Sequence, residues 1–305
     1  MSLFYRIIYS SYINIVLRSL NKLLNRLGIG FKLPPSGTIK INLENNEIIR
    51  FKTNQTDYVA FSIFWHGLYA YEYTYIFEKI SKKINGFIDV GSNGGLYSLM
   101  AAKKSNSIKI LAFDPTPAAN YFMNENIKIN KVEGKITFFN FALSEKTELL
   151  DFFEVKNEKY HFLKYNLGGS SSLVNKPKIC NNLKVNAYSL DNFLYENPKH
   201  RLQVDVIKVD AEGAEPAIIR GMHETIKTFK PILICEILMD NVGGEIEKLA
   251  MEHGYQFFLN QGKQLILVDM IKKNKNEGDM YNYFLVHPSK YFLIEQFVVH
   301  QEQQT

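Results

Sequence analysis

The chain has 305 residues, of which 46% are hydrophobic, which suffices for one large globular domain with a small addition. Its net charge is +5, from 36 basic and 31 acidic residues, and the scattered cations do not support nucleic-acid binding. Two cysteines provide neither a disulfide framework nor metal-ligand spacing, so a reducing, cytoplasmic location is expected.

The first 35 residues are expected to form an N-terminal amphipathic helical segment. Residues 1–28 carry apolar side chains at helical spacing with basic residues distributed among them. The uncharged interval 7–17 is too short to span a bilayer, and no signal-peptide cleavage site follows it. We favour a helix packed over the domain. The alternative is a peripheral contact of residues 1–28 with an anionic membrane surface.

Residues 36–85 are predicted to form a β-hairpin and an aromatic helical cap. Alternating strands over 38–53 flank a turn, and the aromatic-rich stretch 58–84 is mostly helical. Aromatic clusters of this kind are usually core. Tyr71 and Glu72 are nevertheless candidates for substrate binding, because they immediately precede the strand of the main motif.

The stretch FIDVGSNGGLYS is the principal motif of the chain. An apolar strand ends in Asp89 and Val90, breaks into a glycine-rich turn, and continues as a helix. A dinucleotide fingerprint would need glycines where Asn93 and Leu96 stand, which disfavours a nicotinamide oxidoreductase. The spacing that fits is acid-x-Gly-x-x-x-Gly, with Asp89, Gly91 and Gly95. It resembles motif I of class I S-adenosylmethionine-dependent methyltransferases, and that resemblance implies a nucleoside-bearing donor without a pyrophosphate.

The second motif follows at the spacing that the first predicts. Residues 108–114 form a buried strand that ends in Asp114, 19 residues after Gly95. An acid at this strand tip can accept hydrogen bonds from both ribose hydroxyls. Thr116 and Pro117 then match a helix cap and a first-turn proline.

A third strand is predicted over 135–144, and its end, with Asn140 and Ala142, is suited to bracket an adenine. Further strands are expected over 147–155 and 160–166. Residues 168–174, with Ser171, are a candidate substrate flap, and residues 185–194 lead into a helix.

The fourth strand and its turn, within 203–216, concentrate ionisable residues. Alternation places Lys208 and Asp210 on one side of the strand, and Glu212 and Glu215 follow. Four such groups at the carboxyl end of a central strand are costly unless the site uses them. The alternative is an internally paired structural cluster.

The remaining elements complete an α/β fold. A fifth strand over 231–238 carries Glu236, a helix over 243–254 follows, and the stretches 255–260, 263–269 and 281–287 supply the last strands. We expect a Rossmann-like sheet of seven mostly parallel strands, with the last hairpin antiparallel and helices on both faces. The corresponding domain spans 86–288, with a C-terminal tail over 289–305.

Taken together, these blocks resemble the FkbM-type family of class I S-adenosylmethionine-dependent methyltransferases. The resemblance covers about residues 70 to 260 and includes FIDVGSNGGLYSL, LAFDPTP, FNFALSE, GGSSSL, SLDNF, VIKVDAEGAEPAIIRGM and PILICEI. It implies S-adenosylmethionine as methyl donor and O-methylation of hydroxyls on sugars or polyketide-type products. Small departures are Ser92 where alanine is usual, Gly94 where an aliphatic residue is usual, and Asp114 where glutamate is common.

The resemblance implies a role for each matched position. The donor-binding residues would be Asp89, Gly91, Ser92, Asn93, Gly95, Asp114, Pro115, Asn140 and Ala142. The catalytic group would be Lys208, Asp210 and Glu212. From their places along the predicted fold, rather than from the resemblance, we expect acceptor binding by Tyr71, Glu72, Ser171, Glu215 and Glu236.

An alcohol is a poor nucleophile, so Asp210 or Glu212 is the candidate general base, with Lys208 holding that carboxylate or acting itself if its pKa is depressed. We assign no metal ligand, although the same acids would suit a divalent cation. The expected acceptor is a glycan hydroxyl, and the basic charge would tolerate phosphate-linked sugars. Alternatives are a polyketide or other secondary metabolite, and a degenerate scaffold at a membrane surface. No oligomeric state is predicted.

Overall fold

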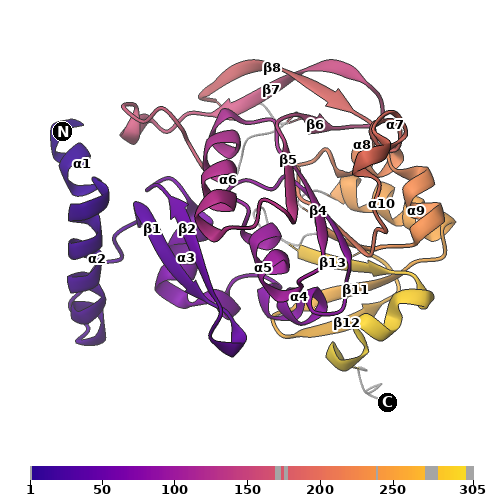
Figure 1. The fold of residues 1–305 in the computed structure, drawn as a ribbon, viewed down its shortest axis with the longest axis horizontal. Coiled ribbons are helices and arrows are strands. Elements are labelled where there is room, and N and C mark those ends of the chain that lie inside the picture. The colour runs from indigo at the N-terminus through magenta and orange to yellow at the C-terminus, as the bar shows by residue number, and fades with distance from the viewer. Residues whose placement is uncertain (1, 169–172, 175–177, 238–239, 272–280, 300–305) are drawn as a thin grey trace.

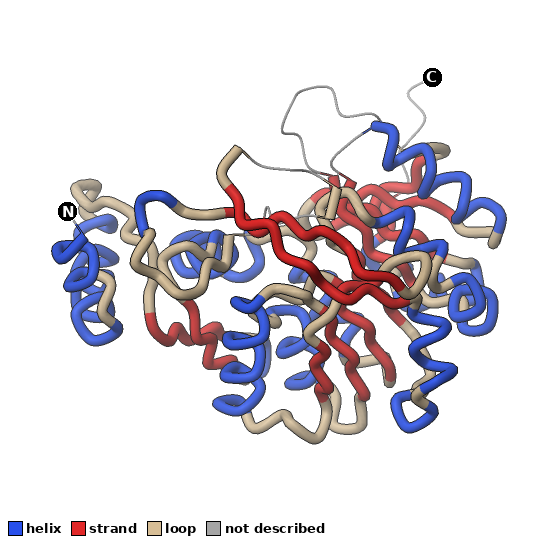
Figure 2. Tube along the Cα trace, turned by 90° about the horizontal axis from the view of Figure 1, so that it is seen from above, coloured by secondary structure: helices blue, strands red, loops and turns tan. Residues whose placement is uncertain are grey.

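The computed structural model describes residues 2–168, 173–174, 178–237, 240–271 and 281–299. In these residues a large mixed sheet lies between two layers of helices, and smaller elements extend from it (Figure 1). The N-terminal helices lie at one end of the molecule (Figures 1 and 2).

The central sheet has nine strands in the described part of the chain, in the order β14-β12-β11-β13-β10-β9-β3-β4-β5. The strands from β10 to β5 pair in parallel, whereas β13 is antiparallel to both β10 and β11. Their bounds are β3 (Gly86–Val90), β4 (Lys109–Phe113), β5 (Ile136–Phe139), β9 (Val206–Val209), β10 (Ile232–Ile237), β11 (Gln256–Gln261), β12 (Gln264–Val268), β13 (Tyr281–Val286) and β14 (Val298–Val299).

This order confirms the predicted Rossmann-like methyltransferase sheet of seven mostly parallel strands, with two additions. β13, one of the seven, lies between β10 and β11, and the first addition, β12, pairs with β11 as an antiparallel hairpin. The second addition, β14, pairs in parallel with β12, so residues 298–299 of the expected tail join the sheet.

Successive side chains along a strand point to opposite faces of the sheet, so the sheet has one hydrophobic core on each face. Phe87 packs into one core with α4, α5 and α6, and its neighbour Ile88 packs into the other with α7 to α10. The helices are α4 (Thr74–Ser81), α5 (Leu96–Lys104), α6 (Pro117–Asn130), α7 (Leu190–Glu196), α8 (Glu215–Arg220), α9 (His223–Phe229) and α10 (Asp240–Glu252).

The N-terminal hairpin, β1 (Gly37–Asn42) and β2 (Ile48–Thr53), is held on the domain by two asparagine side chains of α6. Asn126 and Asn130 each accept a hydrogen bond from a β2 amide and donate one to the carbonyl of the same residue. The side chains of α6 therefore pair with the backbone of β2 as a neighbouring strand would. Together with α3 (Tyr58–His66), the hairpin lies beside the glycine loop. Helices α1 (Ser2–Ile8) and α2 (Ser11–Arg26) cover its outer side.

Two local predictions are wrong, and one strand was not predicted. The third strand divides into β5 and β6 (Ala142–Leu143), and β6 belongs to a separate sheet with β8 and β7 (Glu148–Val155). The strand β8 (Cys180–Tyr188) was not predicted, although it leads directly into α7, the helix that was expected. Residues 160–166 contain no strand, and Tyr160 packs edge-on against two tyrosines of the N-terminal segment.

Candidate active site

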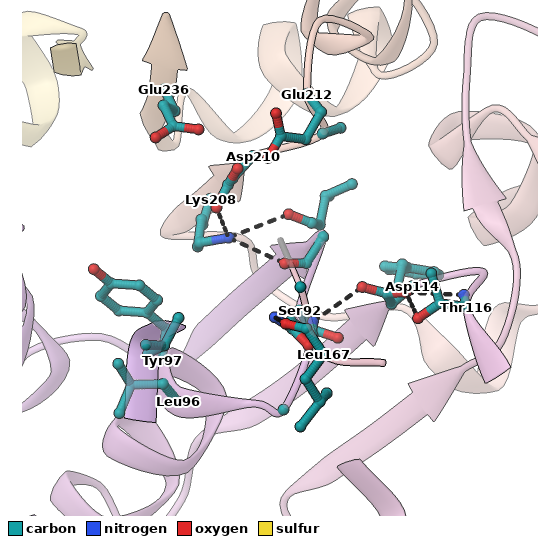
Figure 3. Close-up of a pocket in the computed structure, with 18 of the residues that line it drawn as sticks. Ser92, Leu96, Tyr97, Asp114, Thr116, Leu167, Lys208, Asp210, Glu212 and Glu236 are labelled. Atoms are coloured by element: carbon teal, nitrogen blue, oxygen red, sulfur yellow. Dashed lines mark hydrogen bonds and ion pairs between the residues drawn. The ribbon is translucent and has the colours of Figure 1, made fainter. Parts of the chain in front are cut away.

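The carboxyl ends of β3, β4 and β9 open into a cavity of about 520 Å³. Loops after these strands form its inner wall, and α3, residues 70–72 and residues 166–168 form its outer wall. In an open parallel sheet, ligands bind outside the carboxyl ends of the strands, so this is the candidate active site. Acidic side chains gather on one side of it, and Asp114 and Thr116 lie on another (Figure 3).

The glycine loop after β3 depends on backbone conformations that favour glycine. Gly91 has φ 72°, and a Cβ there would overlap the carbonyl oxygen of Asp210 on the neighbouring strand tip. Gly95 has φ 86° and is the N-cap residue of α5. Asn93 adopts φ 47° without being glycine, a strained conformation of the kind found at functional sites.

Asp114 joins the two strand tips. Its carboxylate accepts hydrogen bonds from the Asn93 amide at 3.0 Å, and from the Thr116 amide and hydroxyl at 2.9 and 2.7 Å. Burial raises the pKa of Asp114, although these hydrogen bonds oppose the shift. Thr116 also caps α6, as predicted, by accepting a hydrogen bond from the Ala119 amide.

Asp89 lies behind the cavity wall and does not line it. The Ser98 hydroxyl donates to one oxygen of its carboxylate at 2.6 Å, and the other oxygen lies 3.7 Å from Lys208 Nζ. Burial raises the pKa of Asp89, against the opposing charge of Lys208. Asp89 therefore faces Lys208 from behind the cavity wall, and its role in donor binding stays a prediction.

Lys208 is a buried cation directed at the cavity edge. Its ammonium lies 3.1 Å from the Asp210 carboxylate, and it donates to the Gly91 carbonyl at 3.3 Å. Burial alone would lower the pKa of Lys208, but the charges of Asp210 and Asp89 outweigh burial and raise it. Lys208 thus stays protonated at neutral pH. Of the two roles considered for it, holding Asp210 fits and acting as a base does not.

Three carboxyl groups converge at this edge of the cavity. One oxygen from each of Asp210, Glu212 and Glu236 lies within 4.8 Å of the others. Burial, followed by the charge of Asp210, raises the pKa of Glu212 to about 8. The same two causes raise the pKa of Glu236 well above its ordinary value. Crowded carboxyl groups retain protons, so a proton stays in this cluster at neutral pH.

Tyr71 and Glu72, the predicted acceptor residues before β3, both line the cavity. Glu72 has φ 41°, and its carboxylate accepts a hydrogen bond from the Tyr97 hydroxyl at 2.6 Å. Burial and the charge of Asp210 raise the pKa of Glu72. The segment before β3 therefore adds a further carboxyl group to the edge of the cavity where Asp210, Glu212 and Glu236 converge.

The other predicted residues have different positions. Ser92, Pro115 and Ala142 line the cavity, whereas the Asn140 amide lies outside it and donates to the carbonyls of Asp114 and Thr116. The Glu215 carboxylate also lies outside the cavity lining, and it accepts hydrogen bonds from the amides of the loop after β9. Ser171 is outside the described residues.

Several lining residues were not predicted. They come from the hairpin, the start of α3, the loop after β4, the glycine-loop helix, β7 and the stretch after it, and include Phe51, Asp57, Tyr58, Ser62, Leu96, Tyr97, Thr116, Phe152, Asn166 and Leu167. Leu96 and Tyr97 lie in the first turn of α5, and Thr116 lies two residues after Asp114, so the two strand–turn–helix motifs could have indicated them. The others are distant in sequence, and no motif marks them.

Comparisons with known proteins show which family the chain resembles. A family model described as "Methyltransferase FkbM domain" matches residues 89–257. The chain is 26% identical over 204 residues to "Methyltransferase sdnD" of Sordaria araneosa, covering 53% of this chain and 74% of that protein. It is 25% identical over 152 residues to "Methyltransferase 1" of Beauveria bassiana, covering 45% and 58%.

Among solved structures, the chain is similar to methyltransferase FkbM from Methylobacillus flagellatus, with 13% identity and a TM-score of 0.40. The match covers 66% of this chain and 43% of that one, so it spans less than half of the solved chain.

Proposed function

The chain is a methyltransferase of the S-adenosylmethionine-dependent FkbM family, and from this premise we propose that it methylates a hydroxyl oxygen of a glycan. One observation carries the proposal: a single cavity joins a glycine loop and Asp114 on one side to the Lys208–Asp210 pair on the other. The first half suits a nucleoside-bearing donor, and the second suits a hydroxyl that must lose a proton.

The donor half has groups suited to S-adenosylmethionine. The Ser92 hydroxyl is buried, lines the cavity and has no hydrogen-bond partner among the described residues. We propose that the glycine loop and Ser92 hold the methionine part, that Asp114 binds the ribose, and that Ala142 lies near the adenine. When bound, the donor supplies an activated methyl group on a sulfonium.

Asp210 is the proposed general base. It faces the cavity, and Lys208 fixes its carboxylate without competing for the proton. Asp210 would take the hydroxyl proton as the acceptor oxygen forms its bond to the methyl carbon and the carbon–sulfur bond breaks. Glu212 remains an alternative, because a pKa of about 8 is close to the working pH of a base.

The charges of the cavity argue for a neutral acceptor rich in hydroxyl groups. Lys208 is the one basic side chain in the described lining, against the carboxyl groups of Asp57, Glu72, Asp114, Asp210, Glu212 and Glu236. Carboxylates accept hydrogen bonds from hydroxyl groups and repel phosphates. The lining therefore argues against phosphate-linked sugars, which the overall charge of the chain would tolerate.

A secondary metabolite is the second candidate acceptor. Phe141, Phe152 and Leu173 line the cavity and offer an apolar surface that a polyketide-type ring would cover.

The test is transfer of label from methyl-tritiated S-adenosylmethionine to three acceptor sets: neutral oligosaccharides, sugar phosphates and macrolide alcohols. We expect labelling of the neutral oligosaccharides, and its loss with Asp210→Asn. Labelling confined to the macrolides would select the second candidate. Absence of donor binding would instead favour the non-catalytic scaffold.

A further inference from the structure

The N-terminal helix α2 is amphipathic, but its polar side faces the protein and its apolar side faces outward. Its buried residues are Asn14, Arg18 and Asn21, with exposed fractions of 0%, 5% and 3%. A surface helix of a globular protein normally turns its apolar stripe toward the core. Here the polar stripe faces the protein.

Specific hydrogen bonds fix this orientation. Arg18 donates from its guanidinium to the carbonyls of Ser36 and Thr38 at 3.2 and 2.7 Å. Asn14 accepts from the Ser36 amide at 2.7 Å and donates to the Pro34 carbonyl at 3.2 Å. Rotating the helix to bury its apolar side would leave these backbone groups unpaired, so the outward apolar face is built into the fold.

The outer face of α2 carries a continuous apolar row. Tyr12, Val16, Leu20 and Leu23 follow one another at spacings of three and four residues, which aligns them on one side of a helix. They are 87%, 58%, 55% and 57% exposed. Leu3, Phe4 and Ile7 of α1 are exposed as well. A large exposed apolar patch marks an interaction surface.

The charges around this face indicate what covers it. Residues 1–43 contain six Lys and Arg residues and no Asp or Glu. Lys22 and Arg26 are exposed on α2 itself, and Arg6 is exposed on α1. A second copy docked on this face would bring two sets of these cations to one interface, which is unfavourable. An anionic lipid surface would accept both the apolar row and the cations.

The shape of the molecule leaves this face accessible. Both views place α1 and α2 at the end of the molecule, on the outer side of the hairpin (Figures 1 and 2). None of the described helices is long and apolar enough to cross a bilayer. We propose that α1 and α2 lie in the plane of an anionic membrane, with the apolar row inserted and the cations at the headgroups.

The experiment is co-sedimentation of the full chain with phosphatidylcholine vesicles, with and without phosphatidylserine. The chain should bind the anionic vesicles and lose binding at high salt. The double variant Leu20→Glu/Leu23→Glu should lower the partition coefficient by about tenfold or more. Lys22→Gln/Arg26→Gln should lower it by roughly tenfold or more on anionic vesicles only.

The matched control is Leu149→Glu/Met251→Glu, which alters two side chains that are 59% and 58% exposed on other surfaces. It should bind like the unmodified chain. Circular dichroism and donor affinity, unchanged in every variant, would show that the domain remains folded.

Three results would overturn the proposal. The first is no sedimentation with anionic vesicles, and the second is an equal loss of binding in the control variant. The third is a stable dimer, seen by light scattering, that Leu20→Glu/Leu23→Glu dissociates while vesicle binding is absent, because it would assign the face to a second copy.

Discussion

The Lys208 ammonium lies 3.1 Å from the Asp210 carboxylate, at the point where a buried strand reaches the cavity. On its other side the same ammonium lies 3.7 Å from Asp89, which is buried behind the cavity wall. One cation thus connects the motif strand β3 to the neighbouring strand β9. The proposed base is held in place by a residue that does not compete for protons.

Asp210→Asn should abolish methyl transfer while donor binding persists. The amide preserves the shape of the side chain but cannot accept the hydroxyl proton, so turnover should fall by about 10²–10⁴-fold. The measurement is label transfer to the acceptor found in the panel, together with calorimetry of the donor. Asp269→Asn, at an exposed position, is the matched control. Unchanged turnover would remove Asp210 from the mechanism.

Glu236→Gln should stabilise the protein at alkaline pH. The folded-state pKa of Glu236 is raised above its ordinary value of 4.5 by burial and by Asp210. The contribution of protonated Glu236 to the free energy of unfolding is complete below pH 4.5, the ordinary pKa. It is lost as the pH rises from there toward the raised pKa of the folded state. Glutamine imitates the protonated form and does not titrate. The melting temperature should therefore exceed that of the unmodified chain by ~2–4 °C at about pH 9, and match it at about pH 5.

The control for this pH dependence is Glu252→Gln, a change at an exposed glutamate. It should leave the melting temperature unchanged at both pH values. A gain with Glu236→Gln that is equal at acid and alkaline pH would show that burial of a polar group, rather than its titration, causes the effect.

Gly94→Ala should destabilise the contact between the glycine loop and the hairpin. A Cβ at this position would lie 2.7 Å from Cζ of the buried Phe51 ring, so the ring or the loop would have to shift. Overpacking of this kind costs about 1–3 kcal/mol, measurable by denaturant unfolding. Phe51→Leu in the same chain should recover part of the loss. Strict additivity of the two changes would refute direct contact between these positions.

Local motifs predicted the side of the cavity that we propose for the donor. The positions of Gly91, Gly95 and Asp114 follow from strand–turn–helix units, in which close residues in sequence are close in space. The alternation of β9 likewise predicted that Lys208 and Asp210 share one side. These features need no knowledge of how distant segments pack.

The outer wall could not be predicted in the same way. Asn166 and Asp57 line the cavity only because the hairpin, α3 and the stretch after β7 dock across the strand tips. The division of the third strand depends on the Asn140 side chain, which donates to the carbonyls of Asp114 and Thr116. β8 was not predicted, because asparagines and small apolar residues alternate along this half-exposed strand. The difference in hydrophobicity between its two faces is therefore small.

The orientation of α2 on the protein also could not be predicted from the sequence. Periodicity identifies an apolar row but not which side faces the protein, and the usual assumption buries it. Here Arg18 and Asn14 reverse that assumption through hydrogen bonds to residues 34–38, whose position depends on the hairpin.

Calorimetric titration of S-adenosylmethionine into the unmodified chain and into Asp114→Ala tests the central claim most directly. The account predicts one-to-one binding that weakens by about tenfold or more in the variant, as the loss of a charged hydrogen-bonding group implies, with no binding of NADH by either. No binding of S-adenosylmethionine by the unmodified chain, or equal affinity in a folded variant, would contradict it.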